Sequence, residues 1–121
     1  MKTTTWGYHL LLDCTEGDLK SVADKENIRS FVKELVVAID MVPFGEPWVE
    51  RFATHDPQKT GVSFCQMIET SNITGHFIDK DGNFYIDVFS CKEFNNQTVV
   101  DIVDKYFKPR KVRVHYISRD A

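Results

Sequence analysis

Two segments of the chain have the hydrophobic pattern of amphipathic helices. The first begins after Asp24, a favourable helix N-cap residue, and ends at the Pro- and Gly-rich stretch 43–47. The second begins after Asn95 or Asn96 and stops before Pro109. Apolar residues at 3-4 spacing share one face of a helix, so both helices are expected to lie on a sheet. These residues are Ile28, Phe31, Val32, Leu35, Val36 and Ile39 in the first helix and Val99, Val100, Ile102, Val103, Tyr106 and Phe107 in the second.

Shorter segments rich in aromatic and β-branched residues predict strands. The Asp-Gly pair at 81–82 is a hairpin signal between two of them. The order β-α-β-β-β-α-β, with helices after the first and fourth strands, predicts an α/β (α+β) two-layer sandwich. In it, an antiparallel sheet carries two helices on one face. The predicted strands are 5–13, 61–69, 72–79, 83–90 and an alternating segment through Val112, Val114 and Tyr116, with 48–54 as a further candidate.

The size and composition of the chain indicate one folded domain. Its 121 residues, of which 42% are hydrophobic and 27% charged, fit a single domain, 1–121, with a hydrophobic core. Fifteen basic and eighteen acidic residues give a net charge of −3 without a basic run, so nucleic acid is a poor candidate partner. The sequence has neither a membrane-spanning apolar stretch nor a signal-peptide core. We therefore expect a cytoplasmic protein without a membrane partner.

The cysteines and histidines show no metal-binding or disulfide pattern. Cys14, Cys65 and Cys91 are odd in number and lack C-x-x-C spacing, which argues against a disulfide framework and against a zinc site. The four histidines are widely separated along the chain. We therefore expect no metal.

The segment 61–91 contains serine, histidine and cysteine residues at informative spacings. Ser71 follows Ser63 by eight positions and precedes His76 by five. Cys91 follows Ser71 by twenty positions and ends the sequence I-D-V-F-S-C, while Ser63 ends G-V-S. These residues resemble the self-processing segment of the small, prokaryotic, pyruvoyl-dependent type of S-adenosylmethionine decarboxylase. The pattern of that family reads G-V-S-G, four or five apolar residues, E-S-H-x-x-x-H and I-D-x-F-x-C.

The resemblance implies a proenzyme that cleaves itself between Thr70 and Ser71. No ordinary side chain is a good electron sink for a carbanion, so amino-acid decarboxylation normally uses a carbonyl cofactor. In the family, the serine hydroxyl attacks the preceding carbonyl, and the resulting ester undergoes β-elimination and loss of ammonia. The product is a covalent pyruvoyl group (pyruvate) at residue 71. Serine is a weak nucleophile, and the family residues that match His76 and Ser63 assist this step.

The resemblance also implies the later steps. The pyruvoyl carbonyl forms a Schiff base with the substrate amine, carbon dioxide leaves, and the residue that matches Cys91 donates a proton. A thiol with a reference pKa of about 8.5 is mostly protonated at neutral pH and can act as an acid. The family serves polyamine (spermidine) biosynthesis, and its protomers pack sheet to sheet so that both contribute to the active site. We expect a homodimer that binds a small-molecule substrate.

The chain departs from the family pattern around the serine. Thr70 stands where the family has Glu, and Glu69, one position earlier, points to the opposite face of a strand. Asn72 replaces a His, and the segment 77–80 replaces T-W-P-E. These differences leave two alternatives open. One is the same chemistry on a basic amino acid such as ornithine or arginine, which an acidic pocket near Glu69 or Asp79 would favour, and the other is an uncleaved binding or regulatory homologue.

The substrate expected from the resemblance has two groups that aromatic rings can bind. These groups are the adenine ring and the sulfonium cation. The polar loop 55–60 is a candidate lid, because loops on a rigid scaffold often carry function. The candidates for substrate binding are Phe52, Phe77 and Glu69, with Phe44 and Trp48 also in suitable regions.

Overall fold

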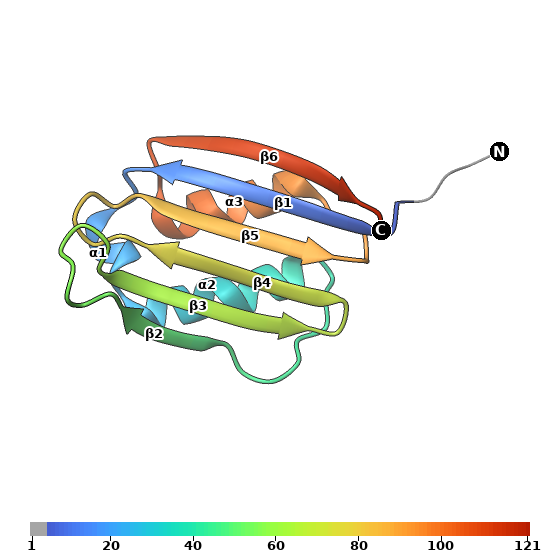
Figure 1. Ribbon diagram of the computed structural model, residues 1–121, viewed down its shortest axis with the longest axis horizontal. Helices are drawn as coiled ribbons and strands as arrows, with labels where there is room; N and C mark the ends of the chain where they lie inside the picture. The colour runs from blue at the N-terminus through green and yellow to red at the C-terminus, as the bar shows by residue number, and fades with distance from the viewer. Residues whose placement is uncertain (1–4) are drawn as a thin grey trace.

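One layer of the molecule is a six-stranded antiparallel sheet, and helices cover one of its faces (Figure 1). The computed structural model describes residues 5–121. The strands are ordered β2-β3-β4-β5-β1-β6, so the first strand of the chain lies between β5 and β6. This arrangement confirms the predicted two-layer sandwich. The elements are β1 (Gly7–Thr15), α1 (Leu19–Val22), α2 (Lys25–Ala38), β2 (Trp48–Phe52), β3 (Gly61–Ile68), β4 (Ser71–Phe77), β5 (Phe84–Ser90), α3 (Asn96–Phe107) and β6 (Lys111–Arg119).

The predicted order of elements differs from the structure in two places. The candidate segment 48–54 forms β2 at one edge of the sheet, so α3 follows the fifth strand and not the fourth. The short helix α1 was not predicted, because a single turn is too short to show a 3.6-residue pattern. Asp18 caps this turn by accepting a hydrogen bond from the Ser21 backbone N–H. The bounds of β1, β3, β4 and β5 lie within two residues of those predicted, and β6 extends three residues beyond Tyr116.

The two long helices begin where the sequence predicts. The Asp24 carboxylate accepts hydrogen bonds from two backbone N–H groups in the first turn of α2. Of the two candidate caps for α3, the structure selects Asn95, whose side chain accepts from the Thr98 N–H at 3.1 Å. The helix α3 ends two residues before Pro109. These local side-chain contacts satisfy backbone donors that a helix leaves free, which explains why the starts were predictable.

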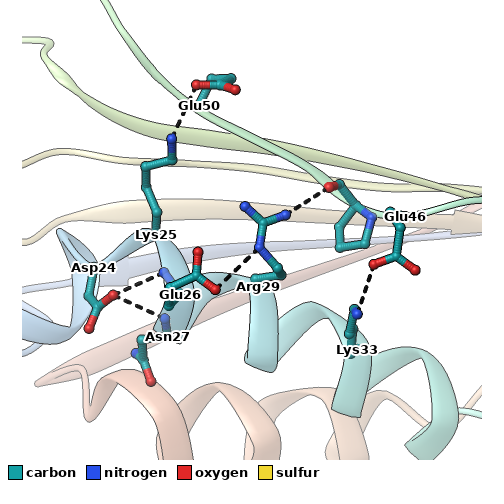
Figure 2. Close-up of polar contacts among 9 residues, drawn as sticks. Asp24, Lys25, Glu26, Asn27, Arg29, Lys33, Glu46 and Glu50 are labelled. Atoms are coloured by element: carbon teal, nitrogen blue, oxygen red, sulfur yellow. Dashed lines mark hydrogen bonds and ion pairs between the residues drawn. The ribbon is translucent and has the colours of Figure 1, made fainter.

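Polar contacts attach α2 to the segment that leads into β2 (Figure 2). The Lys25 ammonium lies 3.2 Å from Glu50, and the Lys33 ammonium lies 2.8 Å from Glu46. Between them, the Arg29 guanidinium donates to a backbone carbonyl of the loop before β2 at 3.1 Å. The three cations are four residues apart and therefore lie along one side of the helix. Exposed pairs of this kind add little stability, but they link an edge strand to the helical layer.

The core between the two layers is centred on phenylalanine rings. Phe77 and Phe84 stack with centroids 5.0 Å apart, and Phe107 of α3 lies 4.8 Å from Phe77. Phe31 of α2 lies 4.9 Å from Phe107. Phe77 is 0% exposed. Its predicted role as a substrate contact is therefore wrong, because the ring packs inside the core.

No helix of the described residues covers the other face of the sheet, which we call the open face (Figure 1). The half-buried and exposed side chains of β4 and β5 that point to it are polar or aromatic. Side chains alternate along a strand. In β4 the buried Phe77 points towards the helices, so Asn72 and His76 point to the open face. The register places Ser63 beside His76, and Phe89 beside Asn72. The open face therefore presents most of the motif side chains.

Candidate active site

The backbone around Thr70 and Ser71 has features that a cleavage site needs. Glu69 and Thr70 form the turn between β3 and β4, and Ser71 is the first residue of β4. The Thr70 carbonyl accepts a 3.0 Å hydrogen bond from the Cys91 backbone N–H. A fixed N–H donor stabilises the charge that develops on a carbonyl oxygen under attack. The Ser71 hydroxyl accepts a 3.3 Å hydrogen bond from the Asn72 side-chain amide.

Ser71 has an unusual backbone conformation. Its φ is +156°, in a region that residues with a Cβ rarely adopt. Such a conformation costs on the order of 1–3 kcal/mol and persists only where the surrounding structure holds it. Here the ladders to Ile68 in β3 and to Ser90 in β5 hold the residue on both sides. The strain adjoins the Thr70–Ser71 peptide bond, so breaking that bond releases it.

Ser63 and His76 are hydrogen-bonded partners on neighbouring strands. The Ser63 hydroxyl is paired with His76 Nδ1, and His76 Nε2 lies 3.0 Å from the Lys59 carbonyl. Because a carbonyl oxygen only accepts, we assign the proton of the neutral ring to Nε2. The Nδ1 lone pair then faces the Ser63 hydroxyl. This pair has the geometry of a base beside a hydroxyl that it can activate.

The polar loop 55–60 lies beside this pair. Its Lys59 carbonyl contacts the His76 ring, and its Gln58 side chain accepts a 2.8 Å hydrogen bond from Lys80. The loop is therefore attached to the end of β4 that carries His76. Its action as a lid stays a prediction.

The predicted site residues form two groups within one chain. Ser71 and His76 lie at opposite ends of β4, five positions apart, which corresponds to about 17 Å at about 3.4 Å per residue. Thr70 and Cys91 lie with Ser71, and Ser63 lies with His76. A hydrogen bond spans about 3 Å. The His76 ring therefore cannot reach the Ser71 hydroxyl of its own chain.

Two exposed aromatic rings border the Ser63–His76 pair on the open face. Trp48 and Phe52 of β2 meet edge to face, with centroids 5.3 Å apart. Their cross-strand partners in β3 lie two positions to either side of Ser63. Phe44 is also exposed, in the loop before β2. Phe52 therefore lies near Ser63 on the open face, and its role as a substrate contact stays a prediction.

The two acidic candidates for a basic substrate lie far apart. Glu69 is exposed in the turn beside Ser71. Asp79 follows the other end of β4, and its Oδ2 lies 2.7 Å from Arg51. Because Asp79 already has a cationic partner and Glu69 lies beyond the opposite end of the strand, the two carboxylates do not form the acidic pocket that a basic amino acid needs.

A further group of residues on the open face, beside the Ser71 end, is absent from the sequence-based predictions. Trp6, Phe89 and Arg119 line a cavity of about 600 Å³. The Arg119 guanidinium lies 5.0 Å from the Phe89 ring centroid, and its Nη1 lies 3.1 Å from His9 Nδ1. The sequence contained one signal for Phe89. Side chains alternate along β5, so Phe89 lies on the same face as the candidate proton donor Cys91.

The three cysteines lie in different surroundings. Burial, together with the nearby Asp13 carboxylate, raises the pKa of the Cys14 thiol to about 12, so this core thiol is unreactive. Cys65 is half-buried, and Cys91 is exposed beside Thr70. Cys91 is thus the thiol nearest the cleavage site. Within residues 5–121, no cluster of three or more His, Cys, Asp or Glu side chains could hold a metal ion, and no helix could cross a membrane.

Known proteins share both the sequence pattern and the fold. The family model of S-adenosylmethionine decarboxylase matches residues 8–120. The S-adenosylmethionine decarboxylase proenzymes of Clostridium botulinum align over 93% of this chain and 93% of their own length, at 27% identity for strain Langeland and 25% for strain Loch Maree. The crystal structure of adenosylmethionine decarboxylase from Aquifex aeolicus VF5 covers 98% of this chain and 94% of its own, with a TM-score of 0.81 at 18% identity, and so has the same fold. The chain belongs to the S-adenosylmethionine decarboxylase family.

Proposed function

We propose that this chain is the proenzyme of an S-adenosylmethionine decarboxylase that cleaves itself between Thr70 and Ser71. One observation carries the proposal. The Thr70 carbonyl accepts a hydrogen bond from the Cys91 N–H and adjoins a strained Ser71. Membership of the decarboxylase family supports the same conclusion. Cleavage converts the single domain into two associated chains, 1–70 and 71–121.

The cleavage uses groups of the chain itself. The Ser71 hydroxyl oxygen attacks the Thr70 carbonyl carbon, its proton goes to a base, and the Cys91 N–H stabilises the oxyanion. The C–N bond then breaks, so an ester replaces the peptide bond and the backbone strain is released. Loss of the Ser71 Cα proton breaks the ester Cβ–O bond and frees the Thr70 carboxylate. Water replaces the nitrogen of residue 71, which leaves as ammonia, and residue 71 becomes a pyruvoyl group.

We assign the base to His76 of a second copy of the chain. Its Nδ1 faces the Ser63 hydroxyl, through which it can accept a proton, but within one chain the ring lies about 17 Å from Ser71 along β4. A two-fold axis between two open faces, perpendicular to β4, brings the Ser71 end of each copy to the Ser63–His76 pair of the other. The polar and aromatic side chains of the open face support its burial in such a homodimer.

The residues beside Ser71 suit the decarboxylation that follows. A pyruvoyl group fits this position because it forms from Ser71 in place, and it supplies the carbonyl electron sink that decarboxylation needs. The exposed Cys91 thiol donates a proton to the substrate carbon after carbon dioxide leaves. Trp48 and Phe52 of the second copy offer aromatic faces to the adenine and the sulfonium. The product is an amine for polyamine (spermidine) biosynthesis in the cytoplasm.

Mass spectrometry of the freshly purified, denatured protein tests the cleavage. We expect two species, 1–70 and 71–121, the smaller with a pyruvoyl terminus. Release of carbon dioxide from S-adenosylmethionine labelled in its carboxyl group then tests the substrate, with ornithine and arginine as competing substrates. A single chain near 14.0 kDa contradicts self-processing and favours the uncleaved homologue. Cleavage with activity on ornithine or arginine alone contradicts only the substrate.

A further inference from the structure

Ser90 is a buried polar residue that the chemistry described above does not use. Its side chain is 0% exposed, and it pairs with Ser71 across β4 and β5. Its hydroxyl lies 2.7 Å from the Thr70 hydroxyl and accepts a 3.0 Å hydrogen bond from the Lys92 backbone N–H. Because that N–H only donates, the Ser90 proton is available to Thr70 or to the Met41 sulfur, 3.6 Å away.

The segment 90–92 therefore holds Thr70 at two points. The Cys91 N–H binds its carbonyl, and the Ser90 hydroxyl binds its side chain. The segment is itself attached to the end of α2, because the Lys92 ammonium lies 2.6 Å from the Asp40 carbonyl and 2.9 Å from its carboxylate. Two contacts at different atoms restrict both the position and the rotation of the Thr70 peptide group.

Stability alone does not account for the buried Ser90 hydroxyl and its contact with the half-buried Thr70. Burying a polar group costs free energy. Its hydrogen bonds largely offset that cost and add little net stability. An apolar side chain of similar size in the same place avoids that cost. What the Ser90–Thr70 contact adds is direction, because a hydrogen bond fixes the orientation of the groups that it joins.

We propose that Ser90 is a positioning residue for self-cleavage, which fixes Thr70 so that its carbonyl carbon faces the Ser71 hydroxyl. The inference rests on the proposed function, because it concerns the same bond. Ser90 contacts the Thr70 side chain and not the reacting atoms, so it acts through Thr70. Thr70 replaces the Glu of the family pattern, and the contact is the means by which this chain orients the replacement.

The rate of cleavage in newly made protein tests this role. Wild-type, Ser90→Ala and Thr70→Val chains are produced by cell-free translation, and the uncut fraction is followed by mass spectrometry over time. We expect each single variant to cleave about 10- to 100-fold more slowly, because a shift of about 1 Å in the reacting groups costs about 10²-fold in rate. The double variant is expected to be no slower than the slower single variant, because both substitutions remove the Ser90–Thr70 contact that orients the carbonyl.

Asn95→Ala is the matched control. It removes the cap of α3, which lies outside the cleavage site, and so lowers stability without touching Thr70. We expect it to cleave at the wild-type rate below its melting temperature. A Ser90→Ala chain that folds and cleaves at the wild-type rate overturns the inference, as does additive slowing in the double variant. If Ser90→Ala does not fold, Thr70→Val decides. A wild-type chain that never cleaves refutes the proposed function itself.

Discussion

The two ends of β4 hold their reactive groups in different ways. At the Ser71 end the groups belong to the backbone: a strained φ and a Thr70 carbonyl fixed by the Cys91 N–H. At the other end they are side chains, a His76 ring whose Nδ1 faces the Ser63 hydroxyl. In the proposed function, one end holds the bond to be broken, and the other holds the base. About 17 Å of strand separates them.

In the proposed mechanism, one copy of the chain therefore contains all the reacting groups without a complete site. A rigid β-strand cannot bend to bring its own ends together. In the proposed homodimer, a second copy on the open face, turned end to end, supplies the missing half to each site. Substitutions at each end of β4 therefore test different parts of the account.

Removing the nucleophile has the largest expected effect. Ser71→Ala is expected to abolish cleavage completely, because the attacking oxygen is lost. Mass spectrometry should then show one chain near 14.0 kDa. Ser118→Ala, on the exposed edge strand β6, is the matched control and should cleave fully. Cleavage of the Ser71→Ala chain at Thr70 contradicts the assigned chemistry.

Removing the base is expected to slow cleavage without changing the Ser71 end of β4. We expect His76→Ala to cleave about 10²- to 10⁴-fold more slowly, the usual contribution of general base catalysis. Time courses of newly made protein measure this rate. His115→Ala, a half-exposed residue of β6 paired with Asp13, is the control and should cleave normally. A His76→Ala chain with the wild-type rate removes His76 from the mechanism.

Substitution of Cys91 distinguishes the role of its backbone N–H in cleavage from the role of its thiol in decarboxylation. In Cys91→Ala the backbone N–H remains, so we expect cleavage close to the wild-type rate. The thiol proton donor is lost, so decarboxylation of S-adenosylmethionine should fall at least about 10²-fold. Cys65→Ala should retain both activities. An uncut Cys91→Ala chain shows that the thiol itself takes part in cleavage.

Substitutions of Phe77 and Phe52 compare the two faces of the sheet. Phe77→Ala should lower the free energy of unfolding by about 3–5 kcal/mol, because it leaves a cavity in the core. Phe52→Ala should change stability by less than about 1 kcal/mol, because the ring is partly exposed, and should raise the KM for S-adenosylmethionine. Urea unfolding and steady-state kinetics measure these effects. An unchanged KM in Phe52→Ala removes that residue from the substrate site.

Much of the fold was predictable because its signals are local. Asp24 and Asn95 cap helices through contacts within one turn, and the alternating strands place their apolar residues in the core. The short helix at 19–22 gave no periodic signal. The burial of Phe77 was available in the sequence, because neighbours on a strand point to opposite faces and His76 belongs to the open face.

The candidate site was predictable as a set of residues but not as an arrangement. Motif spacing identified Ser71 and His76, yet spacing along a chain does not give distance in space until the strand between them is known. Trp6 and Arg119 approach Phe89 only through pairing of strands far apart in sequence. A contact of that kind leaves no local pattern.

Complementation between two variants that are defective in cleavage tests the two-copy site most directly. Ser71→Ala and His76→Ala chains, distinguished by mass tags, are co-expressed and analysed by mass spectrometry. A mixed dimer contains one site with both an intact Ser71 and an intact His76 from different chains. The account predicts that the His76→Ala chains are cleaved in the mixture and the Ser71→Ala chains are not. If the His76→Ala chains in the mixture cleave no faster than they do alone, His76 of a second copy is not the base and the account is contradicted.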